Sequence, residues 1–311
     1  MAVPGSAVPG STVRADVWPG READGGLVAA VLAWGDAHLR DLPWRATRDP
    51  WAVLVSEVMA QQTGVDRVVG YYHAFLGRFP TPADCAAAAA GDVVRLWAGL
   101  GYNRRALNLQ RCAQTVVERH GGALPEDLGA LLALPGVGPY TARAVLAFAF
   151  ERRVGVVDTN VGRVLARWEG RSLRPAEAQA RADGLVPAGA GRSWVWNQAV
   201  MELGGTVCRR RRPGCVSCPV RAWCAWAASG LAAPDPADGS AGVSAGQPRF
   251  EGSDRQGRGR LVDALCRGPV AVGAVPAVMG WPDDPARADR VAIGLVEDGL
   301  AMRDGDLLRL P

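Results

Sequence analysis

The chain has 311 residues, of which 49% are hydrophobic and 21% are charged, and arginine plus lysine exceed aspartate plus glutamate by four. This length and apolar content suit one large folded core or two moderate ones. The small positive excess does not by itself indicate a nucleic-acid partner. No apolar run approaches the roughly 20 residues that span a bilayer, so no membrane partner is expected.

The first 26 residues are rich in Gly, Pro, Ala and Ser and lack periodic hydrophobicity, which predicts a disordered leader. They also lack the charged start and apolar stretch of a secretory signal. We therefore expect a cytoplasmic protein. In that reducing setting, clustered cysteines indicate a metal centre before they indicate disulfides.

From residue 27 to about residue 226 the hydrophobic pattern is almost wholly helical. Asp49 and Pro50 supply an N-cap and a first-turn proline, which open a helix that runs through Gln62. Strand signals are few, so this stretch is predicted to be all-α. Further helices are expected at 65–79, 92–98, 104–119, 126–134, 141–150, 159–168, 176–183 and 193–203.

The composition changes beyond this helical stretch. Residues 227–247 are rich in Ala, Gly, Ser, Pro and Asp, which predicts a linker. Periodicity returns over residues 248–311, where helices are expected around 261–275 and 287–298. Two short apolar runs near the end then predict a hairpin. Helices followed by a hairpin indicate a small winged-helix-like domain.

Four of the seven cysteines lie within seventeen residues, with the spacing C-x6-C-x2-C-x5-C. Thiolates this close in sequence can surround one metal centre, and the spacing alone leaves both structural zinc and an iron–sulfur cluster open. Four arginines lie between the first two cysteines, on a loop fixed at both ends, which favours contact with DNA phosphates over a merely solvated face. The residues are Cys208, Cys215, Cys218 and Cys224, with Arg209, Arg210, Arg211 and Arg212 between the first two.

A glycine-containing turn joins two of the predicted helices in the string LPGVGPYTA, residues 134–142. Gly136 and Gly138 permit a tight turn with positive φ and expose backbone N–H groups at the start of the next helix. Such a turn can hold a DNA phosphate without reading the base sequence. About twenty residues further on, Asp158 precedes a helix, where the commonest role of an aspartate is an N-cap.

Together these motifs closely resemble the helix-hairpin-helix superfamily of endonuclease III and the MutY-type adenine DNA glycosylases, over residues 27–226. The resemblance implies two helical lobes, a [4Fe-4S] cluster on the four cysteines and contacts from Gly136 and Gly138 to the DNA backbone. In this superfamily the aspartate matched by Asp158 stabilises the oxocarbenium-like sugar. Asn160 matches a polar residue beside that aspartate.

Tyr140 stands where bifunctional members of the superfamily carry a lysine that attacks the sugar through a Schiff base. Tyrosine has no amine and cannot form that imine. The sequence therefore predicts that water displaces the base, without efficient strand cleavage.

The segments 41–45 and 56–63 are similar to the start of the MutY-type enzymes. By this resemblance Glu57 protonates adenine, and burial would supply the raised pKa that such an acid needs. Paired carboxylates with opposite roles suit the cleavage of a glycosidic bond. Without its matching neighbours, Glu57 would be interpreted as a surface residue on an amphipathic helix. The resemblance places further substrate contacts at Trp44, Arg45, Gln61, Gln62, Tyr102 and Gln198.

The sequence thus predicts a monomeric, monofunctional glycosylase of base excision repair, which removes adenine opposite 8-oxoguanine or guanine in double-stranded DNA. Two alternatives stay open. A mismatch thymine or uracil glycosylase would not need Glu57, and a non-catalytic DNA-binding or redox-sensing iron–sulfur protein would need neither Glu57 nor Asp158. The tail lacks the length and strand pattern of the larger domain with which many MutY-type enzymes recognise 8-oxoguanine.

Overall fold

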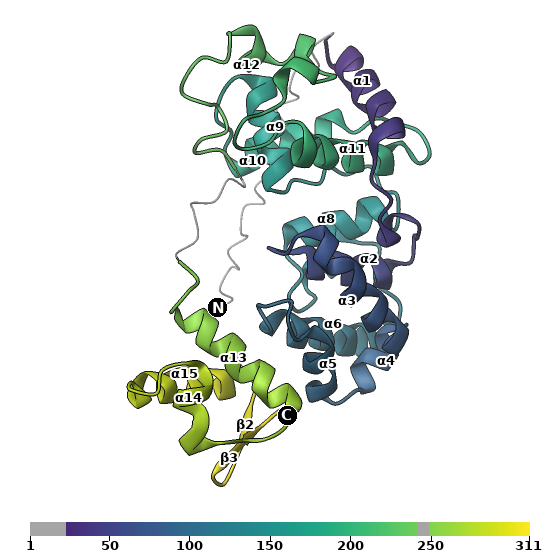
Figure 1. Ribbon diagram of the computed structural model, residues 1–311. Helices are drawn as coiled ribbons and strands as arrows, with labels where there is room; N and C mark the ends of the chain where they lie inside the picture. Colours follow the sequence, from purple (N-terminus) through teal and green to yellow (C-terminus); the bar gives the residue numbers. More distant parts are fainter. Residues whose placement is uncertain (1–22, 242–248) are drawn as a thin grey trace, which may run out of the picture.

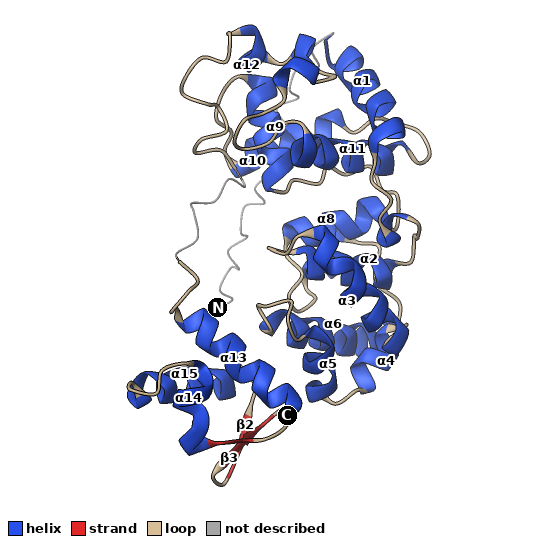
Figure 2. Ribbon diagram, viewed as in Figure 1, coloured by secondary structure: helices blue, strands red, loops and turns tan. Residues whose placement is uncertain are grey.

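The computed structural model describes residues 23–241 and 249–311. Of the predicted leader, residues 1–22 lie outside the described residues, and residues 23–26 begin the first helix. Figures 1 and 2 show a mostly helical chain with one small sheet near its C-terminal end. The helices before the tail are α1 (Ala23–His38), α2 (Pro50–Ala60), α3 (Val65–Arg78), α4 (Pro82–Ala87), α5 (Ala90–Trp97), α6 (Arg104–His120), α7 (Leu128–Leu132), α8 (Pro139–Phe148), α9 (Thr159–Glu169), α10 (Pro175–Leu185), α11 (Arg192–Thr206) and α12 (Ala225–Ala228).

The helix α2 lies at the centre of the first lobe, which comprises α2–α8. Asp49 caps it by accepting a hydrogen bond from the backbone N–H of Trp51, and Pro50 occupies its first turn, as the sequence predicts. Every residue from Trp51 to Met59 is buried, including Glu57. The helix ends at Ala60, two residues before the predicted end, because Gln62 has a φ of +56° that no α-helix contains.

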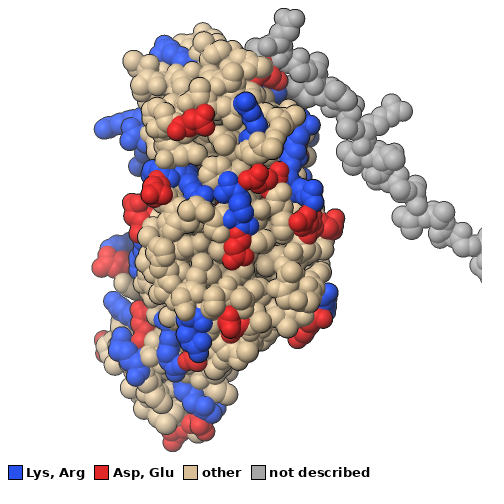
Figure 3. Space-filling view, turned by 90° about the vertical axis from the view of Figure 1, so that its right-hand side faces the viewer, with Lys and Arg blue, Asp and Glu red and all other residues tan. Residues whose placement is uncertain are grey.

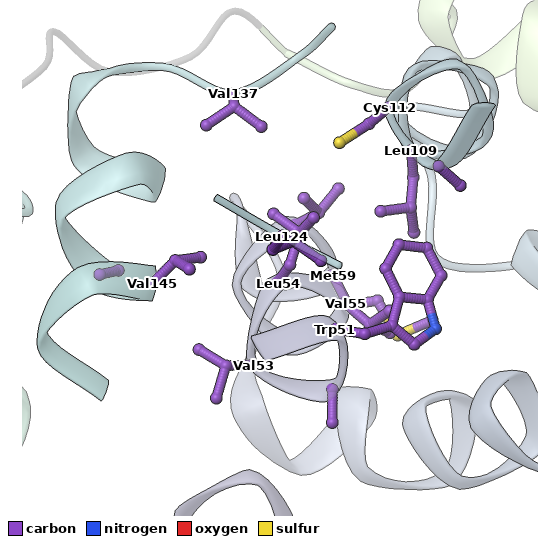
Figure 4. Close-up of a cluster of buried hydrophobic side chains, with 14 of the residues drawn as sticks. Trp51, Val53, Leu54, Val55, Met59, Leu109, Cys112, Leu124, Val137 and Val145 are labelled. Atoms are coloured by element: carbon purple, nitrogen blue, oxygen red, sulfur yellow. The ribbon is translucent and has the colours of Figure 1, made fainter. Parts of the chain in front are cut away.

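The core of this lobe forms between α2, α6 and α8. Leu54 and Met59 of α2 are fully buried among Leu109 of α6 and Val145 of α8 (Figure 4). Truncation of such side chains to alanine costs about 2–5 kcal/mol, since the cavity cannot fully collapse. This packing fixes α2, and with it the position of Glu57.

The second lobe comprises α1 and α9–α12, and Figure 1 shows it above the first. The helix α1 packs along α11, where Gly35 permits the close approach because a Cβ at this position would lie 2.6 Å from the Cβ of Ala199. Leu27, Val164 and Leu203 are buried in the core of this lobe.

The tail folds as α13 (Asp254–Arg267), β1 (Val270–Ala271), α14 (Val275–Met279), α15 (Pro285–Glu297), β2 (Met302–Asp304) and β3 (Leu307–Arg309). The strands form an antiparallel sheet in the order β1-β3-β2, with Leu308 opposite both Val270 and Arg303. The predicted hairpin and winged-helix-like arrangement are confirmed. The predicted helix across residues 261–275 is wrong, because Gly268 and Pro269 end α13 and the next two residues pair with β3.

The tail packs against the first lobe. Val94 of α5 and Leu107 of α6 share an apolar core with Leu261 and Leu265 of α13. The backbone N–H of Gly91 also donates to the carbonyl of Pro311, at 2.8 Å. This contact places α13 beside the loops that follow α2 and α5.

Part of the segment predicted as a linker lies against the second lobe. Ala241 donates its backbone N–H to the carbonyl of Leu173 at 2.8 Å, and Ala237 and Ser240 are buried. Residues 242–247 of that predicted linker lie outside the described residues. No helix within the described ranges is long and apolar enough to span a membrane.

Candidate active site

A buried and a half-buried side chain from different helices of the first lobe meet where the two lobes join. Glu57 lies on α2 with only 7% of its surface exposed, and Tyr140 lies in the first turn of α8. The hydroxyl of Tyr140 donates a hydrogen bond to Oε2 of Glu57, at 2.7 Å. The side chain that would be a lysine in a lyase is thus a phenol that orients a carboxyl group.

Burial raises the pKa of Glu57 from 4.5 to about 7. The hydrogen bond from Tyr140 and the charge of Arg45 oppose this rise, while the negative charge of Asp158 adds to it. A carboxyl group with a pKa near 7 holds a proton at neutral pH and can give it away. The raised pKa therefore gives Glu57 the property that a general acid needs.

Asp158 reaches the same site from the second lobe. It is the N-cap of α9 and accepts hydrogen bonds from the backbone N–H of Val161 at 2.7 Å and from the amide of Asn160 at 2.9 Å. Burial raises the pKa of Asp158, while these hydrogen bonds and the charge of Arg163 hold it down. The pKa of Asp158 thus lies above its ordinary value, while the hydrogen bonds from Val161 and Asn160 stabilise its carboxylate form.

A chain of hydrogen bonds leads from Asp158 toward the cysteine loop. Arg163 donates to Oδ1 of Asn160 at 2.8 Å, to the carbonyl of Gly204 at 2.6 Å and to the carbonyl of Cys208 at 2.8 Å. Sequence reasoning missed Arg163, although it lies three residues beyond Asn160 on the same helix face. The arrangement fixes Asn160, and thereby the carboxylate of Asp158.

Gly204 of α11 allows this chain to form. A Cβ at this position would lie 2.7 Å from the Cβ of Asn160 and 3.1 Å from its backbone, whereas a Cβ on Gly205 would meet nothing within 4 Å. We expect Gly204→Ala to displace Asn160 and to slow base release about tenfold, while Gly205→Ala retains the wild-type rate. Single-turnover rates of the two variants test this, and equal rates would contradict it.

Residues predicted to contact the flipped base form a second polar group at the lobe junction. Arg45 donates to Oε1 of Gln198 at 2.8 Å and to Oε2 of Glu202 at 2.8 Å. Glu202, which the sequence did not single out, is 1% exposed and also pairs with Arg40. Trp44 is half-buried and packs edge-on against Tyr72, with ring centroids 5.5 Å apart, and no hydrogen bond ties it to the carboxyl pair.

Two loops with unusual backbone geometry flank the site. Gln62 and Tyr102 have φ values of +56° and +50°, which side chains other than glycine rarely adopt, and both are exposed. Arg105 joins the loops by donating to the carbonyls of Gln61 at 2.6 Å and Gly101 at 3.0 Å. Strained, exposed loops held by a half-buried cation are suited to contact a distorted ligand.

A cleft of about 950 Å³ separates these loops from α13 of the tail. Gln62, Tyr102 and Arg105 line one side, and Arg255 and Arg258 line the other. The guanidinium of Arg255 lies 3.5 Å from the hydroxyl of Tyr102. Gln61 also lines the cleft, and its amide donates to Thr141 of α8 at 3.4 Å, beside Tyr140. The Gln61–Gln62 turn thus borders the cleft and contacts α8, the helix that carries Tyr140.

The turn between α7 and α8 is a hairpin. Gly136 has a φ of +78°, and a Cβ there would lie 2.8 Å from Asn108. Gly138 has a φ of −94° and is the N-cap of α8, so only the first glycine requires the left-handed region. The backbone N–H groups of the first turn of α8 have no partner within the helix.

The four clustered cysteines lie around one small cavity of about 20 Å³, which Arg167 and Trp226 also line. No disulfide joins any of the seven cysteines, all of which lie within the described residues. Burial raises the pKa of Cys218, and the charges of the other three clustered thiols add to the rise. Over the described residues, no three ligand side chains come close enough to hold a single metal ion. Four thiols around one cavity, three of them with raised pKa values, fit a positively charged centre that would stabilise their thiolates.

The arginines between Cys208 and Cys215 are all exposed. On the face shown in Figure 3, arginines and acidic side chains are interspersed, and no single sign of charge dominates. Local groups such as residues 209–212 therefore carry more information about an anionic partner than the net charge does.

The fold and the opposed carboxyl groups define the class. Residues 55–187 match the HhH-GPD superfamily of base excision DNA repair proteins. Among solved structures, a thermostable thymine-DNA glycosylase superposes with a TM-score of 0.61 and 29% identity, covering 66% of this chain and 97% of that one. An endonuclease III trapped as a covalent intermediate with DNA gives a TM-score of 0.57 and 25% identity, covering 66% and 95%.

The chain is 43% identical to the adenine DNA glycosylase of Mycobacterium tuberculosis over 282 residues, which cover 89% of this chain and 90% of that protein. It belongs to the adenine DNA glycosylase family, as the sequence predicts. It is therefore a hydrolase of N-glycosyl bonds that acts on DNA in base excision repair.

Proposed function

We propose that the chain is a monofunctional glycosylase that releases adenine paired with 8-oxoguanine or guanine. The observation that carries this proposal is the buried Glu57, whose pKa lies near 7, opposite the hydrogen-bonded carboxylate of Asp158. The thymine-DNA glycosylase has the same fold, so the fold alone does not select the base. The acid Glu57 favours adenine as the substrate, because adenine leaves poorly as an anion and departs readily once a ring nitrogen is protonated.

In this mechanism the adenine is flipped out of the duplex into the junction between the lobes. Glu57 gives its proton to a ring nitrogen of adenine. Through its hydrogen bond, Tyr140 then stabilises the carboxylate that Glu57 has become. Positive charge develops on the sugar as the bond breaks, and the carboxylate of Asp158 stabilises it. Water then attacks the sugar and gives a proton to the Glu57 carboxylate, which restores the acid, while Arg45 with Gln198 holds the base.

Strand cleavage through a Schiff base is not expected from this chain. All 35 of its basic Lys and Arg residues are arginines, so no lysine is present anywhere in the sequence. An imine needs an amine, and Tyr140 is a phenol. We expect purified enzyme to leave abasic strands intact until alkali or heat is applied. Efficient nicking without alkali, measured on a denaturing gel, would refute the monofunctional mechanism.

We place the DNA backbone against the hairpin and the cysteine loop. The first turn of α8, after Gly136 and Gly138, offers backbone donors to one phosphate. Arg209–Arg212 offer charge-assisted hydrogen bonds to others. A [4Fe-4S] cluster on Cys208, Cys215, Cys218 and Cys224 would hold that loop in place, and a reducing cytoplasm would keep its thiols available.

We assign the nucleotide opposite the adenine to the cleft beside α13. Arginine and tyrosine are the side chains that stack on and hydrogen-bond to unpaired bases, and Tyr102 and Arg255 face each other across this cleft. The tail would thus contribute to recognition of the base opposite the adenine.

Arg255→Ala tests this assignment. We expect it to reduce the preference for 8-oxoguanine over guanine about threefold to tenfold, because one base contact is worth about 1 kcal/mol or more. Arg303→Ala, which removes an exposed arginine on β2 of the same domain, should leave the preference unchanged. The measurement is the single-turnover rate on each duplex, and an unchanged ratio for Arg255→Ala would remove the tail from recognition.

A further inference from the structure

We propose that Arg167 and Asp235 form a latch that positions the arginine loop and the Cys208 ligand, by binding the segment beyond the cysteines to α9. Nothing in the reaction requires either residue to touch DNA or the reacting atoms. The inference rests on the proposed cluster and DNA contacts, and it concerns how this chain holds them.

Arg167 is the centre of the latch. Its side chain is 1% exposed although it carries a full charge. It forms two parallel hydrogen bonds to the carboxylate of Asp235, at 3.0 Å and 2.5 Å. A buried arginine remains stable only when its donors are paired, and a bidentate carboxylate is the strongest partner available in proteins.

The same guanidinium also contacts the cysteine loop, through Nη1 and through the Nη2 that it shares with Asp235. It donates to the carbonyls of Arg209 at 2.9 Å and Arg210 at 3.3 Å, and to Sγ of Cys208 at 3.3 Å. The guanidinium also lies over the ring of Trp226, 4.7 Å from its centroid. One rigid, planar group therefore fixes the backbone of two exposed arginines and the sulfur of one cysteine.

The segment that supplies Asp235 is itself fixed. Ser172 donates to the carbonyls of Pro236 at 3.1 Å and Asp238 at 2.9 Å, and the backbone N–H of Leu173 donates to Oγ of Ser240 at 3.1 Å. The residues after the cysteines thus pack onto the turn between α9 and α10. Loss of the Asp235 carboxylate would leave the buried charge of Arg167 without an anionic side-chain partner, and the guanidinium would then turn away from the loop or admit water.

The matched variants are Asp235→Asn and Asp238→Asn. Both remove one negative charge from the same segment, and Asp238 is exposed. Simple electrostatics predicts that either change leaves DNA binding unchanged or strengthens it slightly. The latch predicts instead that Asp235→Asn alone weakens DNA binding.

The experiment uses full-length protein isolated anaerobically with its iron, and an undamaged duplex. We expect Asp235→Asn to weaken duplex binding about tenfold and to reduce the salt dependence by about one phosphate contact, while Asp238→Asn matches the wild type. Iron should also be lost several-fold faster in air from Asp235→Asn, since Cys208 loses an ordered donor. Asp235→Glu, which retains the carboxylate, should recover part of both losses.

Equal duplex affinity and equal iron retention for the two asparagine variants would overturn the latch. If Asp235→Asn fails to fold, the affinity of Asp235→Glu relative to wild type decides in its place, and an affinity tenfold weaker with the carboxylate retained would count against the latch. Base release is not measured in this experiment. A failure here therefore leaves the proposed adenine activity untouched, and a failure of that activity leaves the latch testable.

Discussion

Glu57→Gln is expected to slow adenine release by about 10³-fold or more while duplex affinity changes less than threefold. A general acid contributes roughly 10²–10⁴-fold, and adenine has no easy route of departure without its proton. Glutamine has nearly the same shape and can still accept the hydrogen bond from Tyr140, so the loss is that of the proton alone. Glu118→Gln, on an exposed position of α6, is the matched control. Unchanged release by Glu57→Gln would remove the acid from the mechanism.

The raised pKa of Glu57 has two further consequences, one measured on the wild type and one on the Glu57→Gln variant. The wild-type rate should fall as the pH rises through about 7, because the acid must be protonated to act. The pKa of Glu57 in the folded state lies above the unfolded value of 4.5. The free energy of unfolding therefore decreases as the pH rises from 4.5 through 7, because the buried carboxyl group must ionise. Glu57→Gln should therefore raise the free energy of unfolding above pH 7, by on the order of 3 kcal/mol, and the gain should fade toward pH 4.5.

Asp158→Asn is expected to slow release by roughly 10²–10³-fold. Asparagine is as good an N-cap as aspartate, so α9 keeps its first turn and the variant loses only the negative charge that faces the developing cation. Asp127→Asn makes the same change at the N-cap of α7, where the side chain accepts from Ala130, and should retain the wild-type rate. A loss smaller than threefold in Asp158→Asn, with wild-type unfolding, would mean that the charge does not act in the reaction.

Local signals predicted much of the fold. The Asp49 cap and Pro50 located the start of α2, and the hairpin string located the turn before α8. The short helix α4 was missed although its signal was present, since Thr81 and Asp84 form a capping box. In the tail, the helical spacing of apolar residues continues past Gly268. The chain is nevertheless extended at residues 270–271, because β1 pairs with β3.

The candidate site depended more on contacts that no local pattern contains. Resemblance placed Glu57 and Tyr140 in one site, but the hydrogen bond between them joins residues 83 positions apart. The partners that position the site lie still further from any motif. Arg105 gains its role from the backbone carbonyls of another loop, and Glu202 gains its role by pairing with Arg45 across 157 positions. Buried charges of this kind are defined by the packing of the lobes, which the sequence alone does not give.

The central claim is that this chain releases adenine by acid catalysis and leaves the strand uncut. The most direct measurement is single-turnover release of each base from duplexes that pair it with guanine or 8-oxoguanine, with samples analysed before and after alkali. We predict release of adenine alone, faster opposite 8-oxoguanine than opposite guanine, with strand breaks only after alkali. Release of thymine or uracil in place of adenine, or strand breaks before alkali, would contradict it.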